Sequence, residues 1–275
     1  MTSVRENKKL ISTQNAQTKP KQKKNDAGSF NSNCAETKTS AKHSAVSANA
    51  RVSKIRRAKI HREQLPKTKL RGWIHLTTTP LALANSIVLL CFTTTGGQAF
   101  SVVLYLIAGL VLFGCSATYH IGNWNPRTKS ILRRLDHANI FLLIAGTYTP
   151  TSAILLSPSQ TILVLSIIWG GSIIGILMHV FWINSPRWLY VILYVLLGWV
   201  AVWFLPEFWV NGSPAVVVLL LCGGGAYTIG AMFYAFRWPN PWPKYFGFHE
   251  FFHLGTVAGY ACHAVAIWLA LFIVS

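Results

Sequence analysis

Seven long apolar segments, separated by short polar stretches, follow one another along the chain after residue 72. A membrane-spanning helix needs about 20 mostly apolar residues, and each segment reaches that length. The stretches between them contain helix breakers such as Asn125-Pro126 and Ser157-Pro158. We therefore predict an all-α integral membrane protein, a bundle of seven transmembrane helices. The predicted spans are Trp73–Thr94, Phe100–Ile121, Asp136–Leu156, Thr161–Ile183, Trp188–Pro206, Pro214–Phe236 and Phe246–Val274.

The segment before these spans, residues 1–71, contains no comparable apolar stretch. It is rich in Lys, Ser, Thr, Asn and Gln and nearly free of aromatic residues, so it cannot bury enough apolar surface to fold alone. No apolar stretch follows its first basic residues, which excludes a signal peptide. We predict a disordered basic tail over residues 1–71 and a membrane domain over residues 72–275.

Composition agrees with this division. The chain is 52% hydrophobic and only 12% charged, against roughly 25% charged residues in a soluble domain. Of 25 Lys and Arg residues, 18 precede Gly72, so the net charge of +18 belongs mostly to the tail and does not indicate a nucleic-acid-binding fold. The basic stretch Arg51–Arg71 is expected to stay solvated or to bind anionic lipid head groups, which contributes about 1 kcal/mol per basic residue.

The remaining basic residues fall on alternate connections between the predicted spans. Under the positive-inside rule, this bias puts the tail on the cytoplasmic side of a multi-pass protein of the plasma (cytoplasmic) membrane. The five cysteines form no C-x-x-C pair and are expected to be small buried side chains. The basic residues in question are Arg127, Lys129, Arg133, Arg134, Arg187, Arg237 and Lys244.

Ionisable residues inside membrane spans are costly and therefore indicate function. His120 ends the second predicted span, Asp136 begins the third, and His249 and His253 lie in the first turns of the seventh. The predicted topology brings all four to one depth near the cytoplasmic face. Ser116 lies one turn deeper than His120, on the same face of its helix.

Three histidines from two helices suit a catalytic zinc site. The i,i+4 spacing of His249 and His253 lets both rings reach one ion, and His120 would be the third ligand, which leaves a position for water. Asp136 would take a proton from that water, and Ser116 would hydrogen-bond beside it. Packing roles are expected for the other histidines of the spans, namely His75, His137, His179 and His263.

Three motifs resemble those of the hemolysin III family, the bacterial branch of the progestin and adipoQ receptor (PAQR) superfamily. Residues 116–120, SATYH, resemble its S-x-x-x-H element. The run LRRLDHANIFLLIAGTYTP from Leu132 resembles its third-helix motif, and FHEFFHLGTVAGYACH from Phe248 its H-x-x-x-H motif. The resemblance covers most of residues 70–275.

This resemblance implies seven helices, a cytoplasmic N-terminus and a Zn²⁺ ion held by His120, His249 and His253, with Asp136 and Ser116 beside it. It also implies a zinc-dependent hydrolysis of lipid amides of the ceramide type, as described for the eukaryotic receptors. The bacterial branch carries a haemolytic, pore-forming label instead. A cytolytic membrane-perturbing protein or a membrane-stress sensor, with structural zinc closed by Asp136 or His137, therefore remains an alternative.

Residues 249–253, HEFFH, also match the H-E-x-x-H signature of zinc proteases, in which the glutamate is the general base. An intramembrane protease would need a further ligand on a later helix, whereas Asp136 precedes this motif in the chain. We therefore expect Glu250 to be dispensable for chemistry and to lie at the cytoplasmic interface, where a charge costs little.

Overall fold

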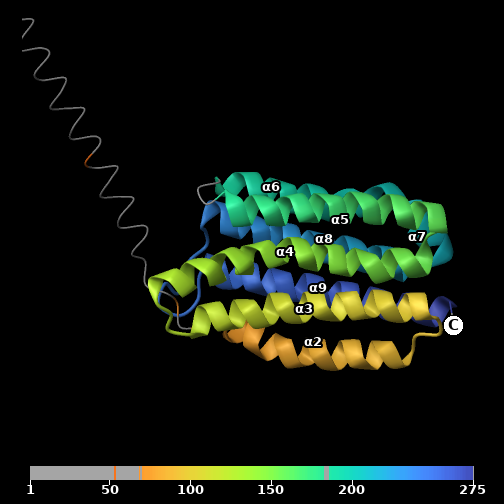
Figure 1. Ribbon diagram of the computed structural model, residues 1–275, viewed down its shortest axis with the longest axis horizontal. Helices are drawn as coiled ribbons and strands as arrows, with labels where there is room; N and C mark the ends of the chain where they lie inside the picture. Colours follow the sequence, from red (N-terminus) through yellow and green to blue (C-terminus); the bar gives the residue numbers. More distant parts are fainter. Residues whose placement is uncertain (1–52, 54–67, 69, 183–185, 275) are drawn as a thin grey trace, which may run out of the picture. The chain divides into compact units, whose positions relative to one another are not determined.

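A bundle of seven membrane-crossing helical segments forms the part of the chain that the computed structural model describes, namely Ser53, Thr68 and residues 70–182 and 186–274 (Figure 1). This confirms the predicted all-α, seven-span architecture. Nearly all of the predicted tail, with its lipid-binding stretch, lies outside the described residues. The helices are α2 Trp73–Cys91, α3 Gly96–Ile121, α4 Pro126–Leu155, α5 Pro158–Phe181, α6 Arg187–Gly198, α7 Leu205–Asn211, α8 Pro214–Phe236 and α9 Phe248–Val274.

Several helices begin with a capping side chain followed by proline. Asn125, Ser157 and Ser213 each accept a backbone N–H three residues ahead, and the proline that follows each of them needs no partner for its nitrogen. The cap at Asn125 starts α4 ten residues before Asp136, so the predicted start of this span was wrong. The basic residues after Pro126 form the first turns of α4 instead of a loop.

The fifth span is interrupted. The α-helix α6 ends at Gly198, a 3-10 helix, η1, follows over Trp199–Phe204, and α-helical structure resumes in α7. The span therefore extends past the predicted end at Pro206. The hydroxyl of Tyr148 on α4 donates to the Gly198 carbonyl and accepts the Ala201 N–H, both at 2.7 Å. This side chain satisfies backbone groups that the interruption frees, as the apolar interior of a bilayer requires.

Helix α9 packs against α8, α4 and α2, so it holds a central position in the bundle (Figure 1). Its closest neighbour is α8, because glycines face each other there. A Cβ on Gly255 would come within 2.9 Å of the Gly230 Cα and 2.8 Å of the Ala226 carbonyl oxygen. Small residues permit this approach of two backbones, which is a common basis of helix association in membranes.

Consecutive helices run in opposite directions, so one end of the bundle collects the starts of α2, α4, α6 and α9 and the ends of α3, α5 and α8. We call it the histidine end. The C-terminus of α9 lies at the opposite, far end (Figure 1).

We expect Gly255→Leu to destabilise the bundle by about 1–3 kcal/mol, since overpacking a tight contact forces backbones apart. Thermal unfolding of the detergent-solubilised chain measures the effect. Gly225→Leu is the matched control, because a Cβ at Gly225 meets nothing within 4 Å. Equal melting temperatures for the two variants would contradict the proposed glycine contact.

Candidate metal centre

Three buried histidines converge at the histidine end of the bundle. One ring nitrogen from each of His120, His249 and His253 lies within 4.8 Å of the other two. The Nε2 atoms of His120 and His249 are 3.1 Å apart. The ring centroids are 4.6 Å apart for His249 and His253 and 5.1 Å apart for His120 and His253.

Local structure explains the convergence. His249 and His253 occupy the first two turns of α9 and share one face because they are four residues apart. His120 is in the last turn of α3, which ends at this side of the bundle. The three histidines thus lie together as predicted, and their role as metal ligands remains a proposal.

The donor set fits a metal ion. Two nitrogens bound to one tetrahedral zinc at about 2.0–2.1 Å would be roughly 3.4 Å apart, close to the 3.1 Å between His120 and His249. The Nδ1 atom of His253 is buried and has no hydrogen-bond partner among the described residues, although a buried polar atom without a partner is costly. Neutral imidazoles clustered in this way are typical ligands of zinc and related transition metals.

Asp136 adds a carboxylate to this cluster. Its Oδ2 atom lies 3.7 Å from His120 Nε2, and its side chain is nearly buried. Ser116, one turn before His120 on α3, is also buried. Its hydroxyl lies near the Asp136 carboxylate. Both side chains therefore belong to the surroundings of the three histidines.

Two other polar residues point elsewhere. Asn139 donates from its side-chain amide to the Val111 carbonyl at 3.2 Å, which joins α4 to α3. His137, considered above as an alternative fourth ligand, has one ring nitrogen 2.7 Å from the Arg133 carbonyl and the other 3.0 Å from the Tyr234 hydroxyl. Its hydrogen bonds favour the packing role over the ligand role.

His75 was expected only to pack, yet it belongs to the surroundings of the cluster. Its ring is buried in the first turn of α2 and stacks on the His253 ring, with 3.9 Å between centroids and 6° between planes. Parallel stacking fixes the plane of His253. The sequence already indicated this position, because His75 lies in the first turn of the first span, at the same predicted depth as the three clustered histidines.

The expectation that the Glu250 charge lies at an interface where it costs little was wrong, whereas its dispensability for chemistry stays a prediction. Its side chain is 0% exposed, and both oxygens have partners. Oε1 accepts from the Thr68 hydroxyl and from Arg71 Nε at 3.4 Å, and Oε2 accepts the Gly247 N–H at 2.8 Å. Thr68 and Arg71, which precede α2, contact its carboxylate and help to bury it.

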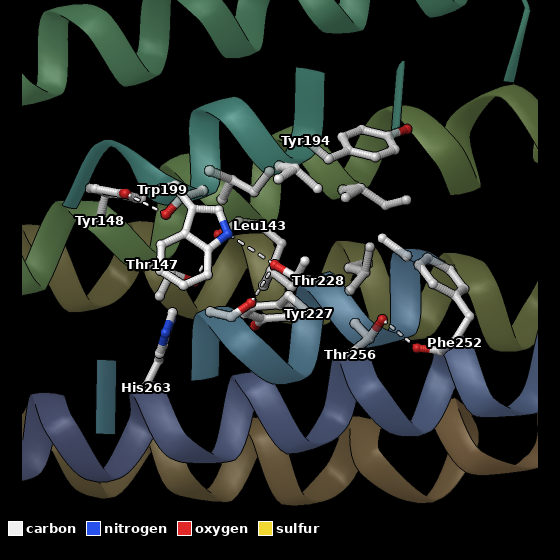
Figure 2. Close-up of a pocket in the computed structure, with 17 residues that line it drawn as sticks. Leu143, Thr147, Tyr148, Tyr194, Trp199, Tyr227, Thr228, Phe252, Thr256 and His263 are labelled. Carbon is white, nitrogen blue, oxygen red and sulfur yellow. Dashed lines mark hydrogen bonds between the residues drawn. The ribbon is translucent and has the colours of Figure 1, made fainter. Parts of the chain in front are cut away.

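An apolar pocket lies beside the cluster, between α3, α4, α6, α8 and α9 (Figure 2). Its lining reaches to within one helical turn of the site residues, since Leu112 is four residues before Ser116, Ile140 is four after Asp136, and Phe252 directly precedes His253. One turn is about 5.4 Å along a helix. The wall carries a few hydroxyls, among them Thr228, which accepts the Trp199 indole N–H at 2.9 Å (Figure 2).

Fold and site together define a class: multi-pass membrane proteins whose helices enclose three histidines and a carboxylate near one end. The profile of the family described as "Haemolysin-III related" matches residues 63–264. The chain therefore belongs to the haemolysin-III related family, as the three motifs indicated.

Individual relatives agree with this assignment. The chain is 30% identical over 186 residues to the "Hemolysin-3 homolog" of Bacillus subtilis (strain 168), covering 66% of this chain and 83% of the relative. It is 30% identical over 184 residues to "Hemolysin-3" of Bacillus cereus, covering 66% and 81%. It is 29% identical over 182 residues to "Heptahelical transmembrane protein ADIPOR2" of Oryza sativa subsp. japonica, covering 60% and 79%. The last match supports the link to the PAQR superfamily.

We expect the purified chain to bind a divalent transition-metal ion and His253→Ala to lose it, because removing one of three ligands leaves too few donors for tight binding. Elemental analysis by mass spectrometry after dialysis measures the metal content. His263→Ala is the matched control, since His263 is a histidine of the same helix outside the cluster. Equal metal content in both variants would contradict the assignment.

Proposed function

We propose that the chain is a zinc-dependent hydrolase of lipid amides of the ceramide type. The observation that carries the proposal is the adjacency of two features: a buried three-histidine cluster with a carboxylate, and an apolar pocket that reaches to within one helical turn of it. The first suits hydrolysis, and the second suits an acyl chain. Together they favour a substrate with a polar amide at one end of a long hydrocarbon.

The metal would be held by His120, His249 and His253. Zinc bound there would act as a Lewis acid toward the amide carbonyl and would make a water molecule a better nucleophile. The nearby His75 ring, stacked on His253, would hold one ligand in orientation.

Asp136 would move the proton. Water adds to the carbonyl carbon, and the carboxylate near His120 accepts the proton that this water gives up. When the C–N bond breaks, Asp136 returns the proton to the leaving nitrogen, so that the products are a fatty acid and an amine. Ser116, next to Asp136, would hydrogen-bond to the water or to the carbonyl oxygen.

The pocket would orient the substrate. An acyl chain lying against Ile140, Leu143 and Ile144 would leave the amide beside Asp136, because these residues follow Asp136 by four, seven and eight positions and share its face of α4. The pocket walls would exclude water from the acyl chain. Burial of its apolar surface would supply binding energy at about 0.8 kcal/mol per CH₂ group.

We expect Asp136→Asn to lower amide hydrolysis about 10²–10⁴-fold, since the amide of asparagine cannot accept the proton. Zinc content should stay at the wild-type value, because Asp136 is not one of the proposed ligands. Release of fatty acid from a ceramide in detergent, with zinc measured in parallel, tests both points.

Glu207→Gln is the control. The Glu207 carboxylate belongs to α7, toward the far end of the bundle, where it accepts a hydrogen bond from Gln160. A zinc-loaded wild-type chain that releases no fatty acid from any lipid amide would overturn the proposal. Vesicle leakage that persists in His120→Ala would favour the membrane-perturbing alternative.

We expect Ala231→Phe to depress hydrolysis of long-chain amides and to spare short-chain ones, because the added ring occupies the pocket that Ala231 lines. Rates for substrates of graded acyl length measure the difference. Met232→Phe is the neighbouring control, since Met232 is 49% exposed on the outer surface of α8. Equal loss for every chain length would contradict a role of the pocket in binding the acyl chain.

A further inference from the structure

Glu250 links two parts of the histidine end that are far apart in sequence. Its oxygen Oε2 accepts the Gly247 N–H, three residues earlier, which is one half of a capping box at the start of α9. Oxygen Oε1 accepts from Thr68 and Arg71, which precede α2. One carboxylate therefore caps the helix that carries His249 and His253 and also holds the chain before α2.

That chain lies against a proposed ligand. We call Thr68, Leu70, Arg71 and Gly72 the strap. Gly72 has φ of +96°, and a Cβ there would lie 2.8 Å from the Cβ of His120. Only glycine adopts this conformation freely and leaves room for the contact. The strap backbone therefore touches the His120 side chain directly.

A second backbone contact fixes the strap on the other side. The Leu70 N–H donates to the Tyr245 carbonyl at 3.4 Å, in the connection that leads to α9. Thr68 is buried, and the Arg71 side chain is 21% exposed. The strap thus runs from the end of α3 to the start of α9, across the two helices that supply the three histidines.

We propose that Glu250 is a positioning residue whose bonds to Thr68 and Arg71 hold the strap over the histidine cluster and so limit access to it from the histidine end. A buried carboxylate is strongly favoured when it has several donors. Losing the strap donors leaves Glu250 with its cap to α9 alone, and the strap then separates from His120. The relevance of this closure to a metal rests on the proposed function, but the closure itself does not.

The test measures how fast the imidazoles react in the metal-free chain. The full chain in lipid nanodiscs is treated with a chelator and then with diethyl pyrocarbonate, and peptide mass spectrometry gives the rate at each histidine. Thr68→Val removes the hydroxyl without changing the shape of the side chain, whereas Thr68→Ser keeps it. We expect modification of His120 to accelerate about tenfold in Thr68→Val and to keep the wild-type rate in Thr68→Ser.

Two further variants act on the strap by other routes. Arg71→Gln removes the charge that pairs with Glu250, and Gly72→Ala pushes the strap away from His120 without removing any hydrogen bond. Both should accelerate modification of His120. His263, in the middle of α9, should keep its rate in every variant, and Glu207→Gln should behave as wild type.

Equal rates at His120 in Thr68→Val, Thr68→Ser and wild type would overturn the proposal. A parallel rise at His263 would overturn it too, because it would indicate general loosening of α9. Amide hydrogen exchange at Leu70 gives a second measure, since its bond to Tyr245 should open in Thr68→Val. A wild-type chain without zinc would overturn the proposed function and leave these outcomes unchanged, so the two failures are distinguishable.

Discussion

The cost of keeping ionisable side chains inside an apolar bundle is the constraint on which the histidine end depends. After residue 72 the chain has only three acids, Asp136, Glu207 and Glu250, and each is engaged by another polar group. Burying a carboxylate or an imidazole without polar partners costs free energy. The helices therefore have to meet in the arrangement that lets these groups contact one another.

The bundle satisfies this constraint through close packing of its central helix. Helix α9 supplies two of the three clustered histidines, and its glycine contact with α8 fixes how near the two backbones approach. Its first turn is held by Glu250, and its His253 ring by His75. Backbone packing, capping and ring stacking thus act on the same few residues.

Much of this could be predicted from the sequence, for identifiable reasons. The number of spans follows from the number of apolar segments that are long enough to cross a membrane. The meeting of His120, Asp136, His249 and His253 follows from their common predicted depth. The start of α4 could not be predicted by charge counting, because a capped helix tolerates basic residues in its first turns. Glu250 was misjudged because its partners Thr68 and Arg71 lie outside every predicted span, and contacts between distant segments leave no periodic signal.

The predicted tail, the cytoplasmic orientation and the identity of the metal stay predictions. In the structure the short motifs of α3, α4 and α9 meet in space, and the family assignment places the chain among related proteins.

Tyr148 has a consequence for how the backbone of the fifth span can move. Its hydroxyl bridges Gly198 and Ala201 at the interruption of the fifth span, and the same helix, α4, carries Asp136. The interruption and the carboxylate are thus both attached to α4. Any movement of the backbone at this interruption would therefore have to be matched by Tyr148, and so by the helix that carries the carboxylate three turns away.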